Sequence, residues 1–469
     1  MSDRPFASKR RAAAPSARFG WMVAVGLGLA LATTTAWAGP DDGFHMSGDA
    51  SMRGGAAVVF SSDAASVWYN PAAAAAIERS QFDFSVSAYG MKRTRIDDAM
   101  VARRGERELA AQGKDEQILV VPTGVGHGFA FPKVGMSLVL HFHTPIYADV
   151  QSRVRVEGED PVNAERTTQE LNGYSSHRRY HFGSTIGWTP NHGRFRMGLT
   201  TGGLYDSNSE FTRLAVLAQS ADESSKSGIV IDFDQASQVV GLEMGFGVAG
   251  VLGKHLQGGA SVRSPAFGVW RRHVGGETLA AVTDDGSLSD AEIIIDGVTQ
   301  EPVPRWLTPW RISAGLAWVY EDLVVEVDGE LTTRKRTGAA EWRRPLVWNL
   351  RAGAHYSIND RFSFGLGVFT DRSTEIEAPL FPGVKVDRWG MSAGLRMRSP
   401  VKLGDGERAR DLVFYTTLAA QFSGGVGRGQ PFIIEYDPDR PVVESVNLTE
   451  THRATQMMLL VNVGSGLHF

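Results

Sequence analysis

The sequence predicts an all-β protein: a transmembrane antiparallel β-barrel of about fourteen strands, with an N-terminal hatch, or plug, that contains a short helix. Three observations predict this fold class. Segments of about ten residues alternate between apolar and polar side chains, long and short connections follow them in turn, and tryptophans gather at both ends of the segments. A membrane barrel has this pattern because its outer face meets hydrocarbon while its inner face lines a lumen.

The first element is a signal peptide, predicted over residues 1–38. Basic residues begin it, Trp21–Leu31 form a short apolar run, and Ala36-Trp37-Ala38 is a small-x-small cleavage site. The run is too short to span a bilayer. We therefore expect export of the mature chain rather than an anchor.

The second element, residues 39–80, does not alternate. A fourteen-stranded barrel encloses more space than its wall side chains fill, so something must plug it. Asn70 is a good helix N-cap, Pro71 suits the first helical position, and five alanines follow. The pattern predicts a thin helix ending near Glu78 in a hatch that lies inside the lumen.

The third element, residues 81–469, is the predicted barrel. Its alternating segments are even in number, and most have the length that a tilted membrane strand needs. The fourteen predicted strands are 82–92, 117–130, 134–145, 174–189, 194–206, 238–252, 254–272, 308–320, 322–334, 346–358, 360–371, 387–398, 411–423 and 455–468.

Connections after the odd strands are long and polar, as at 93–116 and 146–173, whereas most of those after the even strands are short. This alternation indicates external loops and periplasmic turns. With odd strands running outward, two aromatic girdles are expected. The external girdle would hold Trp270, Trp306, Trp310, Trp342, Trp348 and Trp389, and the periplasmic girdle Trp188, Trp318 and Tyr356. The terminal Phe469, on an alternating strand, resembles the signal read by the barrel assembly machinery.

Composition and motifs argue against several classes of functional site. The chain has no cysteine and a net charge of −4, which excludes disulfides and thiolate metal sites and gives no indication of nucleic acid binding. Gly245-x-Gly247-x-x-Gly250 lies within a strand and opens no helix, so it does not indicate a dinucleotide site. His141 and His143 share a strand face without an evident third ligand. We expect no cofactor, no metal and no enzymatic activity.

A family resemblance arises in the hatch. The stretch MRGGAAVVFSSDAASVWYNPA (Met52–Ala72) resembles the N-terminal hatch of the long-chain fatty acid outer-membrane transporters of the FadL type, which include aromatic-hydrocarbon channels. The shared pattern is a small-residue stretch, the acidic-Ala pair at Asp63, and aromatic-Asn-Pro-Ala. Ala260–Trp270, Arg311–Leu331 and Trp348–Asp371 are similar to other family segments. One difference is that alanines follow Asn-Pro-Ala where the family has Gly-Leu or Gly-Met.

The resemblance implies a monomeric barrel in the outer membrane of a Gram-negative-type bacterium, surrounded by outer-membrane lipid. It implies passive, porin-like uptake of long-chain fatty acids or other hydrophobic small molecules. Ligand would bind in the lumen, the hatch would rearrange, and release would follow through a gap in the wall. We expect Phe60, Trp68 and Tyr69 to contact ligand, and Arg388 or Arg396 to meet a carboxylate. The alternatives are packing of these aromatics against the wall and ion pairs of the arginines with wall acids.

The release point is expected in the second and third strands. Pro122 removes a ladder hydrogen bond, and Gly124, Gly126 and Gly128 leave one face bare. These residues predict a dented or bulged wall; alternatively, the glycines only make room for the hatch. Two other functions stay open: an outer-membrane lipid hydrolase, and a non-transporting barrel whose loops bind at the surface.

Overall fold

A computed structural model gives the fold of the chain. It describes residues 44–61, 63–104, 107–160, 165–190, 194–219, 226–282, 288–294, 306–337, 342–374, 384–403, 410–436, 443–447 and 450–469. The predicted signal peptide lies outside these ranges. The division into signal peptide, hatch and barrel therefore stays a prediction.

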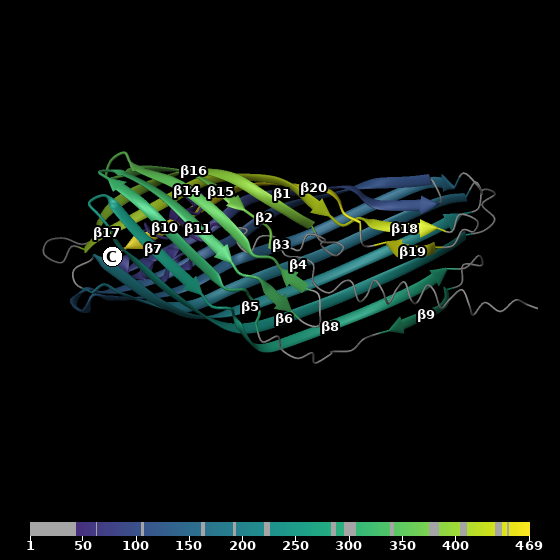
Figure 1. The fold of residues 1–469 in the computed structure, drawn as a ribbon, viewed down its shortest axis with the longest axis horizontal. Helices are drawn as coiled ribbons and strands as arrows, with labels where there is room; N and C mark the ends of the chain where they lie inside the picture. The colour runs from purple at the N-terminus through teal and green to yellow at the C-terminus, as the bar shows by residue number, and fades with distance from the viewer. Residues whose placement is uncertain are drawn as a thin grey trace, which may run out of the picture.

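The described strands form a closed antiparallel barrel with fourteen wall positions, which confirms the predicted fold class. Each wall strand pairs with its sequence neighbours, and the last pairs with the first to close the wall (Figure 1). In order they are β1 (Gln81–Arg104), β2 (Arg107–Phe131), β3 (Met136–Asp160), β4 (Glu165–Trp188), β5 (Phe195–Gln219), β6 (Lys226–Val251), β7 (Leu256–Arg263) continued by β8 (Phe267–Val282), β10 (Arg311–Tyr320), β11 (Leu323–Thr332), β14 (Val347–Ser357), β15 (Phe362–Asp371), β16 (Val384–Leu403), β17 (Arg410–Gly429) and β20 (His452–His468).

The seventh wall position is interrupted, where one continuous strand over 254–272 was expected. Both β7 and β8 pair with β6, but Ser264-Pro265-Ala266 separate them. Pro265 has no backbone N–H to donate to the ladder. Only β7 goes on to pair with β10, whereas β8 continues along β6 beyond the break.

Several predicted loops are strands instead. Figure 1 shows β1 to β6 and β8 continuing well past the ends of β10, β11, β14 and β15, at the end opposite to the C-terminus. Most of 93–116 and 146–173 therefore pairs as hairpin extensions, and the prediction of long loops was wrong there. An antiparallel hairpin needs only its neighbour for hydrogen bonds, so pairing continues beyond the bilayer without an apolar face.

Smaller strands complete this end. The strands β9 (Leu288–Ile294) and β18 (Phe432–Tyr436) add to β8 and β1, and β19 (Val443–Asn447) adds to β18. A separate hairpin joins β12 (Lys335–Thr337) and β13 (Trp342–Arg344). We assign this end as external, because the external connections of bacterial barrels are long and the periplasmic turns short.

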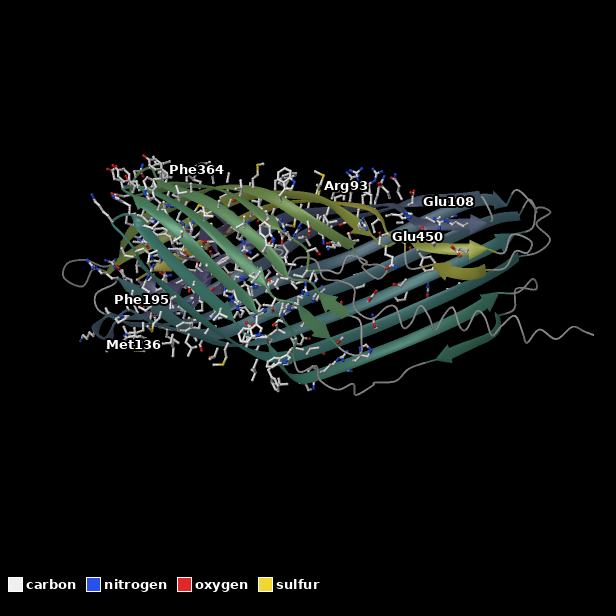
Figure 2. All side chains as sticks on the ribbon, viewed as in Figure 1. Arg93, Glu108, Met136, Phe195, Phe364 and Glu450 are labelled. Atoms are coloured by element: carbon white, nitrogen blue, oxygen red, sulfur yellow. The ribbon has the colours of Figure 1, made fainter. Side chains whose placement is uncertain are left out.

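The outer face of the barrel is apolar. Side chains such as Leu316 and Val368 point outward and are more than half exposed, and sticks cover the outside of the wall in Figure 2. Carboxylates on alternate positions, such as Glu326, point inward and are buried. The predicted girdle residues are exposed as expected, except Trp342, whose side chain lies outside the description. The outward apolar band and inward charges place the chain in an outer membrane.

The helices of the described ranges are short: α2 (Gly48–Met52), η1 (Ala64–Trp68), η2 (Pro71–Ala76) and η3 (Pro132–Val134). Within those ranges, no helix has both the length and the apolar character needed to cross a bilayer. The helix η3 makes the short turn between β2 and β3. The other three belong to a segment that precedes the first strand.

Candidate functional site

The N-terminal segment (residues 44–80, of which 62 is not described) lies inside the barrel. The helix α2 contacts β15, β16, β17 and β20, while η1 contacts β1 to β3 and η2 contacts β3 to β6. A segment that touches strands around so much of the wall must sit within it. Most of its side chains are buried, including Met46, Trp68 and Tyr69.

Local sequence sets the turns of this segment. Ser47 caps α2 by accepting a hydrogen bond from the Ala50 backbone N–H at 3.0 Å. The predicted cap at Asn70 is confirmed: its side-chain oxygen accepts from Ala72 N at 2.9 Å, and Pro71 occupies the first turn. The alanine helix is of the 3₁₀ type and ends at Ala76, slightly earlier than predicted.

Two carboxylates of β11 hold the segment against the wall. Glu326 pairs with Arg53 at 2.8 Å and accepts the Val59 N–H at 2.7 Å. Asp328 accepts the backbone N–H groups of Ala57 and Val58 at 2.8 and 3.0 Å. Both acids are almost completely buried. Because a buried charge is costly without partners, these contacts bind the segment firmly.

A second attachment comes from β16. Arg396 lies 2.6 Å from Asp49 and 3.8 Å from Asp63, both in the N-terminal segment. Arg388 pairs with Asp371 of the neighbouring strand β15. Both arginines thus have acidic partners in this structure, and their contact with a ligand carboxylate stays a prediction.

The glycines of β2 face the segment and leave space for it. A Cβ added to Gly124 would lie 2.1 Å from the Met46 carbonyl oxygen, and one on Gly126 would lie 2.8 Å from backbone atoms of Ala64 and Ala65. A Cβ on Gly128 would lie 2.7 Å from the Cδ1 atom of the Ile77 side chain. These glycines therefore lie close against the N-terminal segment, and their role in a hatch or in a bulged wall stays a prediction.

The wall is also irregular at this point. Among the described residues, the ladder between β2 and β3 ends at Gly124 and His143, although both strands continue. Thr123, next to Pro122, is bulged in the pairing of β2 with β1. The ladder between β3 and β4 is irregular just beyond His143. The irregular pairing and the end of the β2–β3 ladder thus lie close together, and a lateral gap at this point stays a prediction.

The β2–β3 ladder ends beside apolar side chains that face outward. On the outer face of β2, beyond Gly124, Val120 and Ile118 are 59% and 84% exposed. Such apolar exposure is stable where hydrocarbon replaces water. The outer face of β2 beside the end of the β2–β3 ladder is therefore lipid-facing.

An apolar cluster fills the lumen behind the end of the β2–β3 ladder, and we call it the lumen cluster. It joins residues of the N-terminal segment to inward residues of β2 and β20, with Tyr147 of β3 packed on its side. Its members are Phe44, Met46, Ala50, Ala57, Trp68, Tyr69, Leu119, Val121, Met458 and Leu460.

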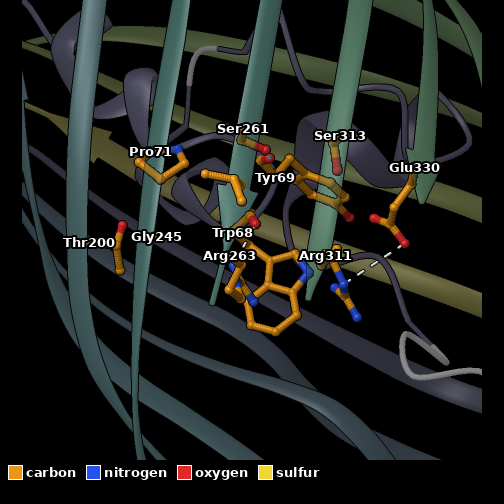
Figure 3. Close-up of a pocket in the computed structure, with 11 residues that line it drawn as sticks. Trp68, Tyr69, Pro71, Thr200, Gly245, Ser261, Arg263, Arg311, Ser313 and Glu330 are labelled. Carbon is orange, nitrogen blue, oxygen red and sulfur yellow. Dashed lines mark hydrogen bonds and ion pairs between the residues drawn. The ribbon is translucent and has the colours of Figure 1, made fainter. Parts of the chain in front are cut away.

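Arginines border the lumen cluster at Trp68. The Arg263 guanidinium lies 3.7 Å from the centre of the indole ring and donates to the Trp68 carbonyl oxygen at 2.7 Å. Arg311 lies 5.5 Å from the same ring and 3.9 Å from Glu330 (Figure 3). A cation over an indole face is attracted by the ring quadrupole. Trp68 therefore lies where the apolar lumen cluster meets the two arginine side chains.

The space at this site is small. Cavities of about 20 and 30 Å³ adjoin Trp68, and one of about 10 Å³ adjoins Tyr69. Each holds about one water molecule, whereas a pocket for a drug-sized ligand measures roughly 300–1,000 Å³. The structure therefore shows the site closed. Tyr69 helps to close it, since its hydroxyl accepts the Met46 N–H at 3.0 Å.

Phe60 lies away from the lumen cluster. It is partly buried against Val59 and β10–β11 residues, and Arg53 lies 5.7 Å from its ring. Its predicted ligand contact stays a prediction. Of the two histidines named from the sequence, His143 lies beside Trp68, 5.2 Å between ring centroids, and His141 lies 5.1 Å from His143. His181, which the sequence did not single out, is 4.9 Å from the Trp68 ring. No group of three potential metal ligands occurs among the described residues.

Sequence reasoning assigned no role to Arg263, Arg311, Arg53 or Glu243. Alternation placed Arg311 on the polar face of its strand, but it did not indicate which residues meet inside the barrel. Arg263 stands in the Arg-Ser-Pro stretch of the family resemblance, which was the available signal. In the structure Glu243 accepts from His181 at 2.6 Å, close to Arg263.

Known proteins share this fold. The chain matches the crystal structure of a Pseudomonas aeruginosa FadL homologue with a TM-score of 0.53 and 12% identity, over 92% of this chain and 100% of that one. It matches the Pseudomonas putida toluene transporter TodX with a TM-score of 0.53 and 15% identity, over 91% and 99%. No family model and no curated protein matches.

At these identities the likeness establishes the fold. The class is thus a fourteen-stranded outer-membrane β-barrel, and the predicted resemblance to the FadL type is confirmed at the level of the fold.

Proposed function

We propose that the protein is a passive outer-membrane channel for the uptake of hydrophobic small molecules. The observation that carries the proposal is the lumen cluster behind the point where the ladder between β2 and β3 ends. An apolar chamber inside a membrane wall gives a lipophile a route that avoids the polar surface of the membrane. Transfer from water into such a chamber stabilises an alkyl chain by about 0.8 kcal/mol per buried CH₂.

The proposal assigns the N-terminal segment the role of the hatch. The cavities at Trp68 and Tyr69 are too small for a ligand, so binding requires the segment to move. A ligand can shift the segment only by binding the open arrangement more tightly than the closed one. Release into the membrane would then follow through the gap beside Gly124.

Two ligand classes fit the site. The printed names of the neighbours are a FadL homologue and a toluene transporter, so fatty acids and aromatic hydrocarbons are the candidates. Arg263 and Arg311 beside the lumen cluster favour an amphiphile with an anionic head, because a guanidinium binds a carboxylate through paired hydrogen bonds. We therefore place long-chain fatty acids first. Monomeric assembly and the barrel assembly machinery stay predictions, and no described residue set favours a hydrolase or a surface-binding barrel.

Uptake by whole cells tests the function. Cells that lack their own outer-membrane fatty acid transporter should take up labelled oleate faster when they express this chain, while entry of a small sugar should not change. Oleate and toluene that both enter no faster than in cells with an empty vector would contradict the proposal. A lipase assay on the same membranes should show no release of fatty acid above that background.

The arginines distinguish the two ligand classes. In a variant carrying Arg263→Gln and Arg311→Gln, we expect oleate binding to weaken by roughly 10- to 100-fold, because a hydrogen bond to a charged group contributes about 1.5–3 kcal/mol. Toluene binding should change little, since it has no charge to pair. Fluorescence of Trp68 provides the readout. Equal weakening for both ligands would show that the arginines act only through packing.

A further inference from the structure

A row of cations crosses the outer wall near its external end. In the strand register Lys385 of β16 lies directly opposite Arg428 of β17, and Arg428 lies directly opposite Arg453 of β20. All three occupy outward positions, in alternation with inward residues, and both arginines are exposed. On β1, the next strand, Arg95 and Arg93 also face outward (Figure 2 labels Arg93).

Such a row is unfavourable by itself. Directly opposed side chains on antiparallel strands have Cβ atoms about 4.5–5.5 Å apart, and like charges at that spacing destabilise the sheet. The acids on this face are engaged elsewhere: Asp97 pairs with Arg95 at 3.0 Å, and Asp387 accepts the Ser373 backbone N–H at 2.9 Å. Among the described residues, no acid within 4.0 Å pairs with Lys385, Arg428 or Arg453.

The row lies directly above the lipid-facing band. Two residues before Arg428 on the same strand, Val426 is 56% exposed, and Met457 on β20 lies four residues from Arg453. At about 3.3 Å per residue, the cations stand roughly 7–13 Å along their strands from these apolar side chains. Trp389 of the external girdle lies four residues from Lys385. The three cations therefore lie at the depth of the lipid head groups, next to the hydrocarbon region.

We infer that Lys385, Arg428 and Arg453 form a binding site for the phosphorylated head group of a glycolipid in the outer leaflet. Phosphate oxygens would lie between neighbouring cations and relieve their repulsion, while the acyl chains of the lipid would cover Val426, Met457 and Trp389. Phosphate and guanidinium groups pair through charge-assisted hydrogen bonds. The exposed apolar residues beside the row specify an anchored lipid rather than a free ion.

Lipid titration tests this site on the full mature protein in nanodiscs. The probes are a diglucosamine glycolipid with two phosphates (lipid A) and its dephosphorylated form, with bound lipid counted by native mass spectrometry. A variant carrying Lys385→Gln, Arg428→Gln and Arg453→Gln should bind the phosphorylated lipid about 100-fold more weakly, given about 1 kcal/mol per cation near an anionic surface. Binding of the dephosphorylated lipid should not change.

The matched control removes three cations at the opposite end. Lys133, Lys254 and Arg361 are exposed in periplasmic turns, and their change to Gln alters the net charge equally. We expect this control to bind the phosphorylated lipid like the unchanged protein. The inference is overturned if the external variant binds the phosphorylated lipid normally, if the control loses as much binding, or if millimolar inorganic phosphate displaces the lipid. Circular dichroism verifies that each variant retains the barrel.

Discussion

Replacing Glu326 with alanine should release the N-terminal segment from the barrel wall. The change removes the partner of buried Arg53 and the acceptor of the Val59 N–H. Breaking a buried ion pair by removing one partner costs about 3–5 kcal/mol, because the other charge stays buried and uncompensated. Hydrogen exchange of residues 44–80 should therefore become roughly 100-fold faster or more, while the strands keep their protection.

A functional consequence should accompany that release. A lumen without its plug conducts water and ions, so we expect higher single-channel conductance in planar bilayers. Arg213→Ala provides the control, because Arg213 and Asp232 form an exposed pair at 2.7 Å, and exposed pairs contribute about 0–1 kcal/mol. Unchanged exchange and conductance in the Glu326 variant would show that other contacts hold the segment without this pair.

Replacing Gly126 with leucine should abolish uptake without unfolding the barrel. A Cβ at this position would already lie 2.8 Å from backbone atoms of Ala64 and Ala65, closer than real contacts allow. The larger side chain must push the N-terminal segment away from β2, beside the end of the β2–β3 ladder. The hatch would then lose its closed position and the gap would be obstructed. Labelled oleate uptake measures the effect.

An outward glycine provides the matched control. A Cβ on Gly329 of β11 would meet only a Leu350 methyl group, at 3.9 Å, so Gly329→Leu should leave uptake normal. Both variants should retain their β-sheet circular dichroism spectrum. Normal uptake in the Gly126 variant would contradict a route past this part of the wall and would leave the glycine with a packing role alone.

The limits of sequence reasoning are clearest at the ends of the strands. Alternation located the membrane part of β1 and β2, because lipid on one side and lumen on the other require opposite chemistry on successive residues. Above the membrane both faces meet water, and the same strands lose that pattern. The hairpin extensions around Arg104 and Asp160 were therefore expected to be loops.

The sequence alone determined the closed barrel, the inward acids of β11 and the cap at Asn70. Each of these features follows from residues that are close in the sequence. Apolar and polar side chains alternate along a strand, and a helix cap is formed within about four residues. Tertiary structure decided which groups meet in the lumen. Arg53 reaches Glu326 and Arg263 reaches Trp68 across about two hundred residues or more. Such pairings depend on the register of the strands in the closed sheet, and a local sequence pattern does not predict that register.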